Sequence, residues 1–225
     1  MGYKYQMHTH TAPCSKCGAM SPEELCRALY EGGFAGCVLT NHFMKGNSGI
    51  DRSLPWEEFV GAYERDYTEC KEAAKKYGLD VIFSIEEHVG GGREILCYGI
   101  TPAMLYKNPQ LANGKIEDWS ALLHENDALC IQAHPFRERA YITAPSAFSL
   151  DLIDGIEVFN IGNTPEANEA AEDFAKKNPS LIFTAGADAH RCDSVCLCAM
   201  EFPERISDEE ALAASLRKKD FKIIK

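Results

Sequence analysis

The sequence lacks the features that mark membrane and secreted proteins. No uncharged apolar run approaches the roughly 18 residues that a membrane-spanning helix needs. The N-terminal stretch, MGYKYQMHTH, has no apolar signal-peptide core. Low-complexity segments and long linkers are also missing. We therefore expect a cytoplasmic protein that makes no contact with a membrane.

Positive charge is scarce as well. Lys and Arg number 23 against 34 Asp and Glu, so the formal net charge is −11. A protein this acidic has no general attraction to DNA, RNA or anionic lipid, which argues against long nucleic acid as a partner. The charge does not exclude a small anionic substrate that is held by metal ions. The sequence does not indicate an oligomeric state.

Two nucleotide-binding motifs are absent. No Gly-x-Gly-x-x-Gly follows the first predicted strand, and no Gly-x-x-x-x-Gly-Lys-Ser/Thr occurs. The first absence disfavours a dinucleotide-binding domain, and the second disfavours a P-loop NTPase.

The 225 residues, 45% of them hydrophobic and 25% charged, predict a single globular domain over residues 1–225. A chain of this size hides roughly 70% of its unfolded surface, so its fold needs no disulfides. The ten cysteines are therefore interpreted as reduced, mostly buried thiols.

Short apolar runs alternate with amphipathic helices along the chain. Strands are predicted at 3–8, 36–40, 80–85, 95–98, 128–133, 155–159, 181–185 and 221–224. Helices are predicted near 21–32, 55–77, 116–125, 164–177 and 207–218, the first and last of them opened by capping boxes. A glycine stretch at 90–92 is expected to be a mobile loop. This alternation is typical of an α/β protein with a mainly parallel sheet, either open or closed into a barrel.

Metal-binding side chains follow nearly every predicted strand. They are His8, His10, His42, Glu86, His134, Asp188 and His190. The carboxyl ends of strands in a barrel converge on the face where active sites lie. His8 and His10 are two residues apart, so on an extended strand both face one side and can bind one ion. A single histidine at a strand end is more often structural, but one shared metal site explains all five histidines at once.

These motifs resemble the PHP family, the polymerase and histidinol phosphatase superfamily of metal-dependent phosphoesterases. The matches are MHTHT, TNH, SIEE, AHP and ADAH, in this order from residue 8 to residue 190. The resemblance implies a distorted (βα) barrel of about seven mostly parallel strands, TIM-like, with the metal site at the C-terminal strand ends. It also implies two or three divalent ions, with Mn, Zn or Fe as candidates.

The resemblance also implies a ligand set. His8 and His10 would bind the first ion with Asp188. Glu86 would bridge to a second ion that His134 also binds. His42 and His190 would bind a third.

Three positions depart from the family pattern. Cys17 stands near the place of an acid or histidine, Asn41 replaces an aspartate, and Glu94 replaces a histidine. Glu94 can still bind a metal and would favour a harder ion such as Mn, whereas a Cys17 thiolate would favour a soft one. Cys17 is thus either a ligand or a thiol beside the metals, and the number and identity of the ions stay open.

The other cysteines allow further interpretations. Cys14-x-x-Cys17 could be half of a zinc site or a redox pair, and Cys192, Cys196 and Cys198 could join it. Because no second Cys-x-x-Cys exists, we favour a loop of reduced thiols next to the metals.

Further residues are candidates for supporting roles. Arg137 and Arg191 follow metal ligands and are candidate contacts for substrate phosphate. Glu157 and His88 are candidates for orienting a ligand from behind, and His88 could instead touch the substrate. His124 is expected on the surface.

The resulting hypothesis is a metal-dependent phosphoesterase. Metal-bound water would attack phosphorus, with no separate protein nucleophile. The expected substrate is a small phosphomonoester such as histidinol phosphate, or a nucleotide or short oligonucleotide. Two alternatives stay open: an amidohydrolase-like C–N hydrolase, and a catalytically weak metal-binding regulatory module.

Overall fold

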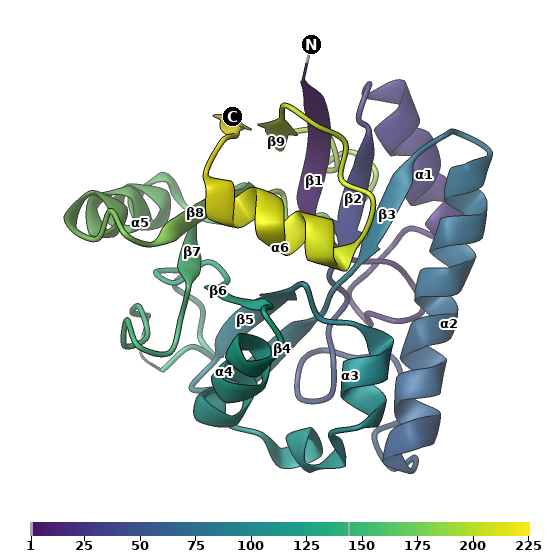
Figure 1. Cartoon of the computed structure of the whole chain (residues 1–225), viewed down its shortest axis with the longest axis horizontal. Helices are drawn as coiled ribbons and strands as arrows, with labels where there is room; N and C mark the ends of the chain where they lie inside the picture. Colours follow the sequence, from purple (N-terminus) through teal and green to yellow (C-terminus); the bar gives the residue numbers. More distant parts are fainter. Residues whose placement is uncertain (1, 144) are drawn as a thin grey trace.

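The computed structural model describes residues 2–143 and 145–225, and within them the strands form two five-stranded sheets. The first sheet has the order β10-β9-β1-β2-β3 and the second β4-β5-β6-β7-β8 (Figure 1). The strands are β1 (Tyr3–Thr9), β2 (Gly36–Leu39), β3 (Asp80–Phe83), β4 (Glu86–Gly90), β5 (Arg93–Tyr98), β6 (Leu129–Gln132), β7 (Gly155–Asn160), β8 (Ile182–Gly186), β9 (Ala199–Phe202) and β10 (Lys222–Ile224).

The prediction of a distorted barrel of mostly parallel strands is wrong. Both sheets are mixed: β1, β2 and β3 are parallel, as are β6, β7 and β8, but β4, β5, β9 and β10 join by antiparallel pairing. Across the described part of the chain, the sheets do not close on each other. Only single bridges link them, Thr9 with Ala189 and His42 with Glu86.

The antiparallel hairpin β4–β5 explains part of this error. Its first strand reads EEHVG, which is too polar to be recognised as a buried strand. Of the glycines 90–92, expected as a mobile loop, Gly90 ends β4 and Gly91 and Gly92 form the hairpin turn. All three have positive φ angles. Glycine adopts this backbone at little cost, so the run permits a tight reversal.

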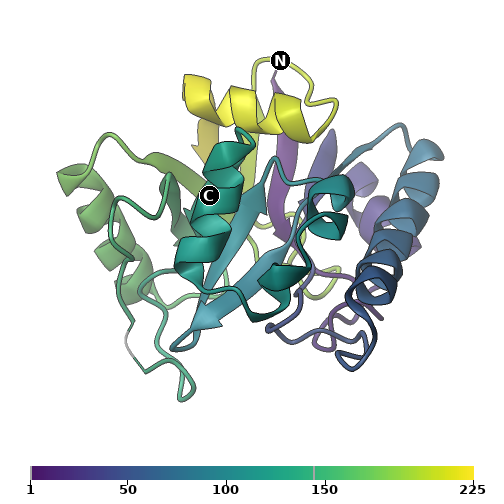
Figure 2. The ribbon, with the colours of Figure 1, turned by 60° about the horizontal axis from the view of Figure 1, so that its bottom comes forward.

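Helices flank the sheets, with α5 at one side and α1 and α2 at the other, while α6 crosses one end (Figure 2). They are α1 (Pro22–Glu31), α2 (Trp56–Lys75), α3 (Pro102–Tyr106), η1 (Pro109–Asn113), α4 (Ile116–Glu125), α5 (Pro165–Lys177) and α6 (Glu209–Lys218). The Ser21 capping box opens α1 as predicted. At α6 the predicted cap is wrong, because Asp208 rather than Ser207 accepts from the Ala211 N–H. None of the described helices has the length and apolar character to cross a bilayer.

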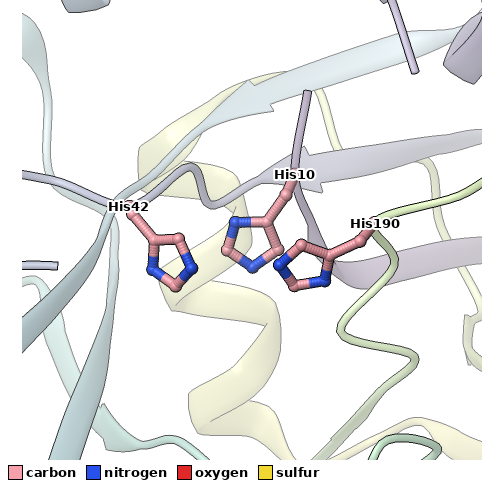
Figure 3. Close-up of side chains that lie close together, drawn as sticks. All are labelled: His10, His42 and His190. Carbon is pink, nitrogen blue, oxygen red and sulfur yellow. The ribbon is translucent and has the colours of Figure 1, made fainter. Parts of the chain in front are cut away.

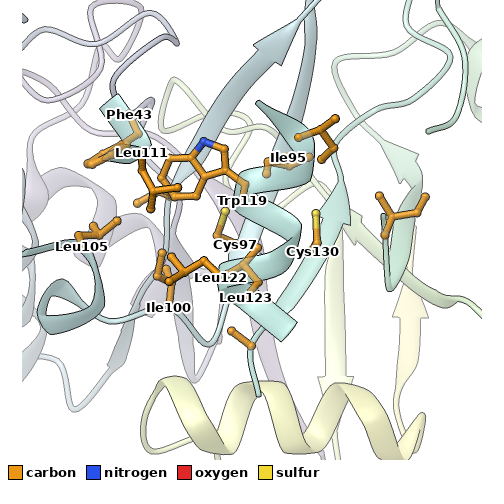
Figure 4. Close-up of a cluster of buried hydrophobic side chains, with 14 of the residues drawn as sticks. Phe43, Ile95, Cys97, Ile100, Leu105, Leu111, Trp119, Leu122, Leu123 and Cys130 are labelled. Carbon is orange, nitrogen blue, oxygen red and sulfur yellow. The ribbon is translucent and has the colours of Figure 1, made fainter. Parts of the chain in front are cut away.

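Hydrophobic side chains fill the spaces on both sides of the strands. One cluster includes Trp119 and Leu123 of α4, which pack over Cys97 and Cys130 of β5 and β6 (Figure 4). A second cluster lies under α6 and includes Leu96 together with residues from both sheets. These cores fix the strand ends that carry the polar residues described below.

The buried Leu123 and the exposed Leu197 offer a matched test of this core. Leu123 is fully buried and Leu197 is 53% exposed. Leu123→Ala is expected to lower the free energy of unfolding by about 2–5 kcal/mol, because it leaves a cavity beside Trp119. Leu197→Ala is expected to change it by less than about 0.5 kcal/mol. Urea unfolding of both variants measures the difference, and equal effects would contradict this core assignment.

Candidate metal centre

The residues predicted as metal ligands come together in one largely buried cluster. They come from β1 and the segments after β1, β2, β6 and β8, and from the hairpin β4–β5. Because β5 runs antiparallel to β6, the start of β5 lies beside the end of β6 and brings Glu94 to the same place. The cluster lies at the base of a pocket of about 500 Å³.

Glu86 lies at the centre of the cluster and contacts four imidazoles. Its Oε1 lies 3.2 Å from His8 Nε2 and 3.0 Å from His134 Nε2. Its Oε2 lies 2.9 Å from His42 Nδ1 and 3.4 Å from His10 Nε2. With two imidazoles at each oxygen, this carboxylate would hold divalent metal together with these histidines.

Two of these imidazoles, His10 and His42, line one side of the cluster together with His190. The His10 ring lies between those of His42 and His190, with centroid distances of 4.4 and 4.2 Å (Figure 3). His10 is fully buried, and burial together with the neighbouring His42 and His190 lowers its pKa to about 3. His10 is therefore a neutral imidazole with a lone pair to offer.

Several histidines have one ring nitrogen fixed by a partner outside the cluster. His8 Nδ1 lies 3.0 Å from Glu157 Oε1, and His10 Nδ1 lies 3.1 Å from Ser15 Oγ. His190 Nδ1 lies 2.7 Å from the carbonyl oxygen of Asp188. Such contacts select the tautomer that leaves Nε2 as the acceptor, and they are typical of metal-binding histidines.

Whether the cluster suits metal ions can be judged from its buried polar atoms that have no hydrogen bond. Five such atoms belong to residues of the cluster: His8 Nε2, His10 Nε2, His42 Nδ1, Glu86 Oε2 and Asp188 Oδ1. Unpaired buried groups of this kind are costly. The residues His8, His10, Glu86 and Asp188 offer ligand atoms within 4.8 Å of one another, and so do two other triads: His10, His42 and His190; and His42, Glu86 and Glu94. Nitrogen and oxygen donors in this arrangement suit divalent transition metals.

Glu94, which replaces the family histidine, faces the cluster. Its carboxylate oxygens lie 3.5 Å from His134 Nε2 and 3.8 Å from His42 Nδ1. Burial and the negative charge of Glu86 raise the pKa of Glu94 to about 8. Glu94 therefore lies where an additional positive charge would stabilise its ionised form.

The backbone at two ligands is strained. His134 and Asp188 have φ angles of 30° and 51°, a region that residues other than glycine rarely adopt. The Glu157 carboxylate accepts from the His134 N–H, and the backbone of Ala189 is paired with that of His8 and His10. Strained residues cluster at functional sites, where the surrounding contacts impose the geometry.

Arg137, the predicted phosphate contact, also supports the cluster. It is buried and donates to Asp188 Oδ2 at 2.7 Å, and its other donors reach Asn160 and Asn163. It lines the pocket, so a contact with phosphate stays a prediction. Arg191, by contrast, is exposed, pairs with Asp193 and is not among the residues that line the pocket.

The other supporting residues occupy distinct positions. Glu157 contacts both His8 and the backbone of His134, which fits the predicted orienting role. His88 lines the pocket, and its Nε2 accepts from the Gly92 N–H. His124 lies on α4 away from the cluster and pairs with Asp154.

A buried polar network behind the cluster was not predicted. Asp66 of α2 accepts from the Thr11 hydroxyl and from Asn41 Nδ2, at 2.7 and 2.8 Å. Asn41 Oδ1 in turn accepts from Ser15 Oγ, which contacts His10. The signal available in the sequence was an acidic residue on the apolar stripe of a long amphipathic helix.

The two cysteines of Cys14-x-x-Cys17 separate in the structure. Cys14 is buried in the hydrophobic core, whereas Cys17 is exposed and lines the pocket. Although burial opposes ionisation, contacts with His190 and His42 lower the pKa of the Cys17 thiol to about 6. Cys196 lies against α1, and Cys198 is buried beside Gln6. All ten cysteines are free thiols, as predicted.

The ion pair of Arg137 with Asp188 predicts an effect on metal affinity. Arg137→Gln is expected to weaken binding of Mn²⁺ or Zn²⁺ roughly 10- to 100-fold, because Asp188 loses the partner that orients it. Arg27→Gln, an exposed change on α1, is the control. Competition with a chromophoric chelator measures both affinities, and an unchanged affinity in Arg137→Gln would argue against the orienting role.

The burial of Asp66 predicts a pH-dependent difference in stability. Burial and the like charge of Glu69 raise its pKa from 3.8 to about 6, against its hydrogen bonds to Thr11 and Asn41. The folded state thus holds a proton that the unfolded state releases, so Asp66 lowers stability as pH rises from about 4 to about 6. Asp66→Asn keeps an acceptor and does not titrate. The free energy of unfolding of Asp66→Asn, relative to that of the unmodified chain, should rise across this pH window by at most roughly 3 kcal/mol and then level off.

Urea unfolding of both proteins between about pH 4 and pH 8 measures this difference. Asp208→Asn, at the exposed cap of α6, is the control for a carboxylate whose pKa is not raised by burial. A stability difference between Asp66→Asn and the unmodified chain that does not change with pH would show that Asp66 is not destabilised by ionisation.

Comparisons with known proteins give one sequence match and several structural matches. The sequence profile of a PHP-associated family matches residues 165–221, which include Asp188 and His190. No curated protein matches the chain in sequence.

Three solved structures share the fold. A Bifidobacterium adolescentis protein named as a metal-dependent phosphoesterase is 15% identical, with a TM-score of 0.57, over 94% of this chain and 95% of that chain. A two-domain Bacteroides vulgatus protein, containing a predicted PHP-like metal-dependent phosphoesterase, is 16% identical with a TM-score of 0.66, over 99% of this chain and 64% of its own. PsfC from Pseudomonas syringae is 13% identical with a TM-score of 0.66, over 100% of this chain and 92% of its own. Residues 165–221 are thus similar to a PHP-associated family, and the chain shares its fold with these three structures.

Proposed function

We propose that this protein is a metal-dependent phosphoesterase that hydrolyses a small phosphorylated substrate. The observation that carries the proposal is the buried cluster of four histidines around Glu86, in which nitrogen and oxygen atoms lack a hydrogen bond. Two of the solved structures that share its fold are named for this class of activity.

Charge in the pocket favours an anionic substrate once metals are bound. Glu86, Glu94 and Asp188 lie at its base, and by themselves they would repel a phosphate. Divalent ions held there would reverse the local charge, lower the pKa of a water nucleophile and stabilise negative charge on phosphoryl oxygens. Lys45 and Arg52 line the same pocket and add positive charge.

The chain's own residues position the reactants. Arg137 and the strained backbone orient Asp188, and Glu157 orients His8 and His134. The Lys45 ammonium is held by the Gly114 carbonyl oxygen at 2.5 Å, and Arg52 donates to the Gly46 carbonyl oxygen. These contacts fix two cations on the pocket wall, where they would steer the substrate's charged group toward the cluster.

The size of the pocket supports a small substrate. A volume of about 500 Å³ lies within the range of small-molecule sites, about 300–1,000 Å³. With a net charge of −11, the chain has no general attraction to a long polyanion. A phosphomonoester such as histidinol phosphate fits these limits, and so does a nucleotide.

The C–N hydrolase alternative has less support. Glu86, not a lysine, contacts four imidazoles at the centre of the cluster. Lys45 lines the pocket, but its ammonium contacts the Gly114 carbonyl oxygen. A catalytically weak regulatory module would bind metals equally well, so turnover decides that alternative.

Metal content and turnover should be lost together when a ligand is removed. Purified without chelator, the protein is expected to carry divalent metal and to hydrolyse an aryl phosphate with Mn, Zn or Fe. His10→Ala should lose bound metal and reduce kcat/KM by at least about 100-fold. Removing a metal ligand is expected to cost more than removing a residue that only orients a ligand. His124→Ala, on the surface of α4, is the matched histidine control.

Elemental analysis and a panel of phosphate esters, amides and lactams read out this experiment. Absence of metal in the unmodified protein would refute the site. Metal with turnover of amides alone would favour the C–N hydrolase, and metal without any turnover would favour the regulatory module.

A further inference from the structure

Cys17 lies at the outer end of the imidazole cluster on a firmly anchored loop. The Lys16 N–H donates to the Asn47 carbonyl oxygen at 3.0 Å, and the Ala19 N–H donates to the His190 carbonyl oxygen at 2.8 Å. An antiparallel bridge joins Ser15 to Ser48. The loop is therefore tied to the segments that carry His42 and His190, on either side of the thiol.

The sulfur atom faces a nitrogen atom of His190, and His42 lines the same pocket. Cys17 Sγ lies 3.0 Å from His190 Nε2. Because His190 Nδ1–H is directed at the Asp188 carbonyl oxygen, Nε2 is left as the acceptor that faces the sulfur. Thiolate sulfur and imidazole nitrogen are the donors that Zn²⁺ binds in structural and catalytic sites.

A hydrogen bond between a thiol and an imidazole does not account for the surroundings. His10 and His42 lie in the same group of three imidazoles. The buried His10 Nε2 and His42 Nδ1 atoms lack a hydrogen bond, although carboxylate oxygens of Asp188 and Glu86 lie 3.2 and 2.9 Å away. Cys14 lies in the hydrophobic core, so Cys17 is the one thiol of the Cys14-x-x-Cys17 pair at this site. The nitrogen atoms that remain unpaired point to a cation as the missing partner.

We propose that Cys17, with His42 and His190, binds a thiophilic divalent ion at the outer end of the metal centre. Glu86, Glu94 and His134 form the oxygen-rich inner end, which suits a harder ion. The proposal rests on the proposed function, since both use one centre. Its consequence is that the centre selects different metals at its two ends.

Cobalt spectroscopy of the full-length chain tests the ligand directly. After chelator treatment, Co²⁺ is added to the unmodified protein, Cys17→Ser and Cys196→Ser. A near-ultraviolet sulfur-to-cobalt charge-transfer band is expected in the unmodified protein. It should be lost in Cys17→Ser and kept in Cys196→Ser, whose sulfur lies against α1. Cobalt bound without the band, or a band retained in Cys17→Ser, would overturn the proposal.

Metal affinity provides a second measurement that does not depend on turnover. Cys17→Ser is expected to weaken Cd²⁺ binding roughly tenfold or more while circular dichroism stays unchanged. Cys17→Asp should lose Cd²⁺ preference and gain affinity for Mn²⁺, because it exchanges a soft donor for a hard one. An identical order of metal preference in the unmodified protein and in Cys17→Asp would contradict the assignment.

These results separate the ligand proposal from the proposed function. A sulfur-to-cobalt band without phosphoesterase turnover supports the Cys17 ligand and refutes the phosphoesterase. Turnover of phosphate esters without the band supports the phosphoesterase and refutes the Cys17 ligand. Failure to bind any divalent ion refutes both.

Discussion

The burial of Glu86 among four imidazoles is the constraint on which the site depends. A carboxylate taken out of water must be compensated by positive charge or strong hydrogen bonds. Burial opposes ionisation, yet His8 and His42 hold the pKa of Glu86 well below its usual range. Glu94, Asp188 and Glu157 add three more carboxylates, while Arg137 is the permanent cation that contacts Asp188. Divalent ions would supply the positive charge that this arrangement calls for.

The fold meets this constraint by holding several candidate ligands through partners behind them. Partners outside the cluster hold one ring nitrogen of His8, His10 and His190. Partner residues therefore come from several elements: Ser15 from the loop after β1, Glu157 from β7 and Arg137 from the segment after β6. The mixed sheets bring these elements together without a closed barrel, because the hairpin β4–β5 carries both Glu86 and Glu94 toward the strand ends.

Sequence patterns predicted which side chains lie together better than they predicted the topology. The His-x-His and Asp-x-His spacings depend on local strand geometry, so His8, His10, Asp188 and His190 could be placed together from sequence alone. Strand direction depends on contacts distant in sequence, and the polar EEHVG strand gave no sign of an antiparallel hairpin. The hydrogen bonds of Asp66 could not be predicted from the sequence either, because its partners Thr11 and Asn41 lie far away in the chain.

Two of the departures from the family pattern, Cys17 and Glu94, change the hardness of the donor atoms in the cluster. Cys17 lies with His190 at the outer end, and Glu94 lies with His134 at the inner end. One exchange adds a soft donor and the other adds a hard donor, and they occur at opposite ends of the same cluster. Their combined effect is to make the two ends chemically unequal. A centre built this way would favour a harder ion at one end and a more thiophilic ion at the other.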